Sequence, residues 1–177
     1  MTAESNASEP AQTMWAGRFI TAIKQGNWEY VARRGGIEAA VIVAFDAQDR
    51  VVLVEQYRVP LGRRSLELPA GLVGDDHAGE PVTDAAGREL EEETGYRAGR
   101  MEELGFFHAS PGMVTEGFTL VRAHDIVKVG DGGGAGDEEI EVHLVPRAEI
   151  AAFVAAKRAQ GVAMDVKMLL LLADALI

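Results

Sequence analysis

Residues 88–95 read Arg-Glu-Leu-Glu-Glu-Glu-Thr-Gly, and this acidic stretch continues a helical pattern of apolar residues. Because an α-helix advances about 100° per residue, Glu89 and Glu93 fall inside the apolar arc of that helix, and Glu92 lies at its edge. Glu91 points away from the arc. The apolar members of the arc are Val82, Ala85, Ala86 and Leu90.

Carboxylates that turn inward are costly to desolvate unless something neutralises them. A solvated acidic helix face is the ordinary alternative, but such a face more often alternates its charges, since each like-charged pair at i,i+3 or i,i+4 costs about 0.2–0.5 kcal/mol. Carboxylates suit Mg²⁺ or Mn²⁺, and the chain contains no cysteine for a thiolate zinc site. We therefore predict a divalent metal site formed by Glu89, Glu92 and Glu93.

The composition is that of one globular domain. The chain has 177 residues, of which 47% are hydrophobic and 25% charged. The 17 Lys and Arg against 28 Asp and Glu give a net charge of −11, which disfavours nucleic acids and anionic membranes as partners. The lack of cysteine fits a reducing cytoplasm, and the longest apolar run, at 168–172, is too short to span a bilayer.

The order of strand-like and helix-like segments, separated by glycine, proline and polar turns, predicts an α+β (or α/β) sandwich in which helices cover a mixed sheet. Pro81 in the first turn and Gly95 at the C′ position frame the acidic helix. Two further helices are expected at 147–160 and 165–176, and the glycine-rich stretch 130–136 is expected to be a mobile loop. Strand patterns are predicted at 14–34, 38–45, 51–57, 66–71, 103–108, 118–123 and 140–145.

Two finer expectations concern connections and boundaries. The turn 46–49 is expected to join its flanking strands into a hairpin. We divide the chain into a disordered tail at 1–13, which lacks the features of a secretory signal, a strand region at 14–36, and the main domain at 37–177.

The spacing Gly-x5-Glu-x7-Arg-Glu-Leu-x-Glu-Glu-x-Gly-Tyr, from Gly74 to Tyr96, resembles the Nudix box of the Nudix hydrolases. This family cleaves nucleoside diphosphates linked to another group. The resemblance implies an α/β/α sandwich with a mixed central sheet, here with an antiparallel N-terminal extension. The family glycine usually follows a Pro-Ala-Gly strand end, which is Gly71 here, so we expect an insertion of about three residues at 75–77.

Segments outside the box are similar to the ADP-ribose pyrophosphatase branch: Val54-Glu55-Gln56-Tyr57-Arg58, Glu67-Leu68-Pro69-Ala70-Gly71 and Ser110-Pro111-Gly112. That branch hydrolyses ADP-ribose to AMP and ribose 5-phosphate, usually as a homodimer whose N-terminal strands help to build the partner's site. The resemblance therefore implies a small nucleoside diphosphate sugar as the substrate. GDP-mannose is an alternative, and a non-catalytic nucleotide sensor is a third reading that the intact glutamates oppose.

The resemblance also implies roles for individual residues. The carbonyl of Ala70 would join the glutamates as a metal donor, and Arg88 would orient those glutamates. Glu138 is the preferred base, with Glu139 and Glu116 as alternatives. Glu80 either contacts the residues that hold the metal, without binding the metal itself, or stabilises the loop in which it lies.

Substrate contacts are expected from two segments, around residue 28 and at residues 58–64. Trp28 would stack on the base, with core packing as the alternative, and Glu29 would accept from an exocyclic amine. Arg58 and either Arg63 or Arg64 would hold phosphates, although the latter two also suit a solvated surface.

Overall fold

The computed structural model describes residues 4, 7–74, 79–136 and 138–172, and all structural statements below concern these residues. Three expectations fall wholly or partly outside them. These are the disordered tail at 1–13, the insertion at 75–77 and the end of the last helix. Within the described part of the chain, no helix has the length and apolar character needed to cross a bilayer.

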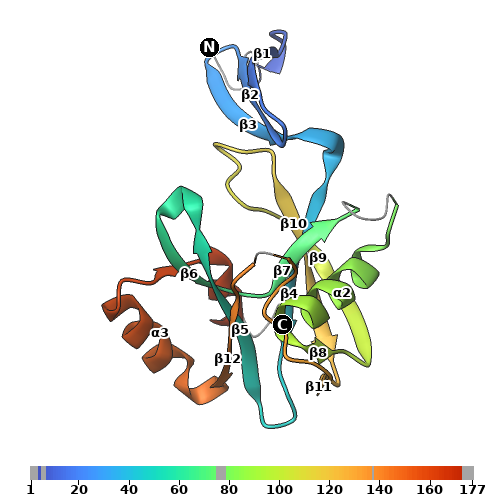
Figure 1. Ribbon diagram of the computed structural model, residues 1–177. Coiled ribbons are helices and arrows are strands. Elements are labelled where there is room, and N and C mark those ends of the chain that lie inside the picture. The colour runs from blue at the N-terminus through green and yellow to red at the C-terminus, as the bar shows by residue number, and fades with distance from the viewer. Residues whose placement is uncertain (1–3, 5–6, 75–78, 137, 173–177) are drawn as a thin grey trace.

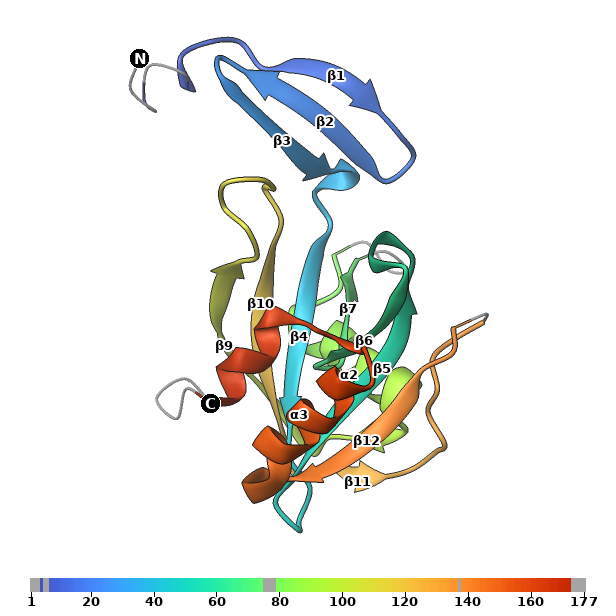
Figure 2. The same ribbon diagram turned by 90° about the vertical axis from the view of Figure 1, so that its left-hand side faces the viewer.

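The N-terminal strands form a separate antiparallel sheet of β1 (Gln12–Ala16), β2 (Ile20–Gln25) and β3 (Trp28–Arg33). Figures 1 and 2 show this sheet standing away from the rest of the molecule. It meets the body where Val31 bridges Val114 and the amide of Thr115 donates to the carbonyl of Val31 at 3.0 Å. The sheet therefore rests on the loop that precedes β10.

The body contains two four-stranded mixed sheets and one two-stranded sheet. The first large sheet has the order β7 (Ala70–Val73), β4 (Glu38–Ala44), β10 (Gly117–His124) and β9 (Arg100–His108). The second has the order β12 (Glu141–Pro146), β5 (Arg50–Arg58), β6 (Arg63–Glu67) and β13 (Ala163–Met164). The small sheet pairs β11 (Val127–Lys128) with β8 (Tyr96–Arg97).

Two α-helices cover these sheets, and Figure 1 shows α2 (Val82–Thr94) and α3 (Ile150–Ala159) on opposite sides of them. The arrangement is thus an α/β/α sandwich with mixed strands, as expected. Short 3₁₀ helices fill the connections: η1 (Arg34–Gly36), η2 (Val59–Leu61), η3 (Arg147–Glu149) and η4 (Val166–Leu172). The expected C-terminal α-helix is therefore a 3₁₀ helix as far as residue 172.

The expected hairpin of β4 and β5 does not form. The two strands belong to different sheets, and an isolated bridge joins Phe45, just after β4, to Val51 of β5. Both strands are buried on both faces, so each needs neighbours of its own in the interior of a layered fold. The turn at 46–49 is a corner between sheets, held by Asp46, which accepts from the amides of Gln48 and Arg50.

Alternate residues of β4 supply two cores. Val41 and Val43 face the space between the two large sheets, whereas Ala40 and Ile42 face α2. Leu90 of α2 is fully buried against that second face, which contributes roughly 1.5–3 kcal/mol. This packing fixes the acidic helix against β4 and β7.

The helix boundaries agree with the sequence pattern to within one residue. Pro81 is the N-cap residue rather than part of the first turn, and the helix runs from Val82 to Thr94. Gly95 follows in the left-handed conformation, with φ of 69°, and its amide donates to the carbonyl of Glu91 at 2.8 Å.

Candidate active site

A cavity of about 400 Å³ opens where α2, β7 and the N-terminal end of β10 meet. It brings together six of the residues that the sequence singled out, from five separate regions of the chain. They are Arg58, Ala70, Glu89, Glu93, Glu116 and Glu138. Three carboxylates, of Glu89, Glu93 and Glu138, therefore share one hollow.

Glu89 reaches the cavity because Gly71 lets its side chain pass close to β7. A Cβ atom at Gly71 would lie 2.0 Å from Cδ of Glu89, so any larger residue would displace that carboxylate. Only 14% of the Glu89 side chain is exposed. The glycine of the Pro-Ala-Gly segment thus leaves the space that the Glu89 side chain occupies.

Glu93 is the most deeply placed acid of the helix, 5% exposed. Burial raises its pKa to about 8, and the nearby charges of Glu89 and Glu138 add to this. A hydrogen bond from the amide of Ala70, 3.1 Å from Oε2, and the charge of Arg58 act in the opposite sense. A carboxylate that is this costly to ionise calls for a cation beside it.

Arg88 lies among three glutamates. Its Nη1 donates to Oε1 of Glu89 at 2.9 Å and to Oε2 of Glu92 at 3.3 Å, while Nη2 lies 3.6 Å from Oε2 of Glu80. Burial lowers the pKa of Arg88, but the charges of Glu89, Glu80 and Glu92 outweigh it and raise that pKa above its usual value. The guanidinium stays charged and joins three glutamates.

Arg58 and Glu116 each enter the cavity already paired. Arg58 makes two parallel bonds to Glu67, of 2.9 and 2.8 Å, and the bond to that carboxylate raises the pKa of Arg58. Glu116 accepts from Nη2 of Arg33 at 2.6 Å. Both pairs line the same cavity as Glu89 and Glu93.

The remaining sequence candidates lie outside this cavity. Glu92, Arg63 and Glu139 are exposed. Trp28 is 41% exposed and lines a second cavity of about 320 Å³, between the N-terminal sheet and the loop at 111–115. Its neighbour Glu29 is exposed on β3.

Four polar lining residues were given no role from the sequence: Arg33, Gln56, Glu67 and Lys167. Glu67 could have been found, because a charged residue between two buried leucines needs a partner. Lys167 is a lone cation in an apolar run, which is a weaker signal. Arg33 carried no local signal, since it reaches the cavity only through the docking of β3.

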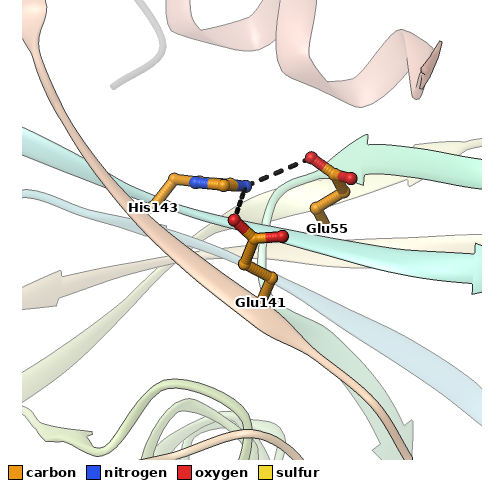
Figure 3. Close-up of side chains that lie close together, drawn as sticks. All are labelled: Glu55, Glu141 and His143. Atoms are coloured by element: carbon orange, nitrogen blue, oxygen red, sulfur yellow. Dashed lines mark hydrogen bonds and ion pairs between the residues drawn. The ribbon is translucent and has the colours of Figure 1, made fainter. Parts of the chain in front are cut away.

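A second acidic cluster lies among Glu55, Glu141 and His143, shown in Figure 3. Its central carboxylate is already neutralised. Glu55 accepts from Nζ of Lys157 at 2.6 Å, from Nε of Arg64 at 2.8 Å and from Nε2 of His143 at 3.2 Å. This cluster is an ion-pair network that joins β5, β6 and β12 to α3, and a metal would have to displace its cations.

The donors of the large cavity fit a divalent cation better. Glu89 and Glu93 offer hard carboxylate oxygens, and the burial of Glu93 leaves its negative charge in need of a compensating cation. A hard cation bound there would offset that charge. The chemistry of Glu89 and Glu93 therefore fits a divalent cation, whereas Glu92, the third predicted ligand of the helix, is exposed and is not among the residues that line the cavity.

Comparison with known proteins agrees with this geometry. A family model described as NUDIX domain matches residues 36–165. The chain is 39% identical over 146 residues to a GDP-mannose pyrophosphatase of Cronobacter sakazakii, covering 77% of this chain and 72% of that protein. It is 41% identical over 92 residues to an ADP-ribose pyrophosphatase of Mycobacterium tuberculosis, covering 52% of this chain and 44% of that protein.

A solved structure shows the same fold. It is the crystal structure of an ADP compounds hydrolase, with a TM-score of 0.72 and 24% identity, and the match covers 94% of this chain and 91% of that one. The expected fold class is thus confirmed. Together with the match over most of the chain, these findings show that the protein belongs to the NUDIX family of pyrophosphatase enzymes and is similar to its ADP-ribose pyrophosphatase branch.

Proposed function

We propose that this protein hydrolyses the pyrophosphate of ADP-ribose to AMP and ribose 5-phosphate, with Mg²⁺ or Mn²⁺ as the cofactor. The observation that carries the proposal is the meeting of Glu89, Glu93 and Glu138 in one cavity that is also lined by cationic side chains. A diphosphate needs both features, because its charges must be neutralised while a water is activated beside it.

In this scheme Glu89, Glu93 and the carbonyl of Ala70 hold the metal, with Glu92 at the outer edge. A metal bound there would lower the pKa of a coordinated water and offset the charge of the diphosphate. Arg88 keeps the glutamate side chains in place through its bonds to Glu89 and Glu92. Glu80 forms an ion pair with Arg88 and so helps to hold the guanidinium in place.

Glu138 is the proposed base. Its carboxylate takes a proton from the attacking water as the new P–O bond forms and the bridging P–O bond breaks, leaving AMP and ribose 5-phosphate. Glu116 is the weaker candidate, because it is already paired with Arg33. Glu139 is exposed and does not line the cavity as described.

Substrate phosphates would meet Arg33, Arg58 and Lys167 in exchange for the present partners of these cations, which are Glu116, Glu67 and Asp165. Trp28 lines the cavity beneath the N-terminal sheet, where it would stack on the adenine, and its neighbour Glu29 would accept from the adenine amine. Arg63 stands exposed at the start of β6, where it could steer an anionic substrate.

GDP-mannose is the second candidate substrate. One observation favours it: the GDP-mannose pyrophosphatase relative covers 77% of this chain, against 52% for the ADP-ribose relative. A pure nucleotide sensor is disfavoured, because such a protein has no need of three carboxylates in one cavity.

A substrate panel tests the proposal. ADP-ribose, GDP-mannose and other nucleoside diphosphate sugars are incubated with Mg²⁺ or Mn²⁺, and phosphate is measured after a phosphatase that attacks only the products. We expect ADP-ribose to give the highest kcat/KM and chelation to abolish release. Preference for GDP-mannose would shift the assignment to the second candidate, and lack of turnover with every sugar would overturn hydrolysis.

The proposal extends to assembly and location. The N-terminal sheet exposes Met14, Trp15, Phe19 and Trp28, each by 41% or more. Apolar side chains in such numbers on one small sheet support a homodimer. The cysteine-free composition supports a cytoplasmic enzyme.

A further inference from the structure

The glycine-rich loop after β11 is bonded to the end of the acidic helix. Resting on the proposed function, we propose that Gly132, Gly133 and Gly134 form a positioning element that ties Glu138 to the backbone of the proposed metal ligands. In this structure, the glycine-rich stretch caps the C-terminal end of α2.

The cap satisfies the last carbonyl groups of the helix one by one. The amide of Gly134 donates to the carbonyl of Glu92 at 3.1 Å, and the amide of Gly133 donates to that of Glu93 at 2.8 Å. Nζ of Lys128 donates to the carbonyl of Thr94 at 2.8 Å. These carbonyls have no partner inside a helix, so the loop replaces water at its end.

The same loop then holds Glu138. The amide of Ile140 donates to the carbonyl of Gly133 at 3.1 Å, which closes the loop on itself. Within it, the amide of Ala135 donates to Oε2 of Glu138 at 3.1 Å, and the amide of Glu138 donates to the carbonyl of Ala135 at 3.3 Å. Gly133 is therefore bonded both to the ligand-bearing helix and to the segment that carries the proposed base.

Two of the glycines are required by space as well as by backbone conformation. A Cβ atom at Gly132 would lie 2.4 Å from the carbonyl carbon of Thr94, and one at Gly134 would lie 2.6 Å from Cβ of Glu138. Both have positive φ, of 74° and 91°. Gly136 also has a positive φ, of 64°, but its Cβ would meet nothing within 4 Å.

This difference supplies a matched pair of variants. Gly134→Ala should displace Glu138, whereas Gly136→Ala imposes backbone strain in the same loop without that collision. We expect Gly134→Ala to lower kcat about tenfold or more, because small displacements of a reacting group are costly, and to leave KM within about twofold. Gly136→Ala should stay within about twofold of the wild type in both constants. Equal losses in the two variants would overturn the inference.

A double-mutant cycle asks whether the glycine acts through Glu138. In a Glu138→Gln background, Gly134→Ala should cause no further loss of kcat, since the group that it displaces is already disabled. Mn²⁺ binding, followed by the electron paramagnetic resonance of the free ion, should be unchanged by Gly134→Ala. A full tenfold loss in the Glu138→Gln background, or lost Mn²⁺ binding, would assign the glycine a general structural role instead.

An activity-independent measurement separates this inference from the proposed function. The amides of Gly133 and Gly134 should exchange slowly with deuterium in the wild type and quickly in Gly132→Ala, whose side chain would push the loop off the helix. Fast exchange in the wild type would overturn the capping whatever the substrate. If all nucleotide sugars fail as substrates, slow exchange would still support the capping while the proposed function falls.

Discussion

Glu93 combines two properties that conflict in a metal-free protein. It is 5% exposed, and its pKa is raised to about 8 by burial and by the charges of Glu89 and Glu138. An acid with a pKa above its unfolded value binds protons more tightly in the folded state, so folding becomes less favourable as it ionises. The position is therefore better suited to function than to stability.

We predict that Glu93→Gln stabilises the metal-free protein at pH 8 and inactivates it. In EDTA, the wild type should lose stability as the pH rises from about 4.5 to about 8, by an amount on the order of a few kcal/mol, whereas the variant should lose less. Thermal and urea unfolding across this range would measure the difference. The expected loss of hydrolysis is about 100-fold or more.

Glu91→Gln is the control, because Glu91 lies on the outer side of the same helix and pairs with Arg97 at 2.8 Å. It should keep activity and the wild-type pH dependence of unfolding. A Glu93→Gln variant that unfolds with the same pH dependence as the wild type would show that Glu93 is not the source of that dependence.

Trp28→Ala should raise KM about tenfold or more and change kcat little. Stacking on a base contributes to the ground state and the transition state alike, so its loss weakens binding without slowing the chemical step. Steady-state kinetics with the preferred nucleotide sugar would measure both constants. An unchanged KM would mean that Trp28 serves packing or assembly alone.

At the scale of elements, the network around Glu55 connects β5, β6, β12 and α3. Its carboxylate is only 3% exposed. Burial by itself would raise the pKa of Glu55, but the bonds from Lys157, Arg64 and His143 outweigh it and lower that pKa. Stability from this network is therefore present above the unfolded pKa of Glu55 and is lost as the pH falls through its lower folded pKa.

We predict that Glu55→Gln destabilises the protein at pH 7 by about 1–3 kcal/mol, because three cationic partners lose their anion. The difference from the wild type should shrink as the pH drops below about 4, and EDTA should not change it. Urea unfolding of both proteins would test this. Glu102→Gln, in a pair exposed at the surface, should have little effect, and an equal effect of the two changes would contradict the prediction.

The elements also show where sequence patterns suffice. The limits of α2 followed from Pro81 and Gly95, because caps are local features. The neighbours of β4 and β5 in their sheets could not be predicted in this way. A strand buried on both faces has no alternation of apolar and polar residues that would identify its neighbours. The capping role of 130–136 was hidden for a similar reason: glycine content indicates conformational freedom but not the contacts that restrict it.

At the scale of the whole molecule, the candidate site combines local and distant contributions. Glu89 and Glu93 could be placed from helix periodicity, and Glu138 from family resemblance. Arg33 and Lys167 could not, because they reach the cavity from opposite ends of the chain. The cations proposed to meet the substrate phosphates are thus the residues that the sequence identifies least readily.

The N-terminal sheet gives a prediction at this scale. Trp15 and Phe19 are 57% and 62% exposed. We expect the wild type to be a dimer by light scattering after size exclusion, and Trp15→Ser with Phe19→Ser to shift it toward a monomer. The control is Val166→Ser with Leu169→Ser, because these side chains are 64% and 62% exposed on η4. It should leave the dimer intact. A wild-type monomer at micromolar concentration would contradict the prediction.

The pairing of β5 with β12 has a consequence for the order of folding. Glu55 and His143 are bonded although they are 88 residues apart in the chain. Contacts this remote must wait for a large loop to close, which slows a transition state that depends on them. Glu138 lies just before β12, so during refolding we expect helical signals to return first and catalytic competence to return last.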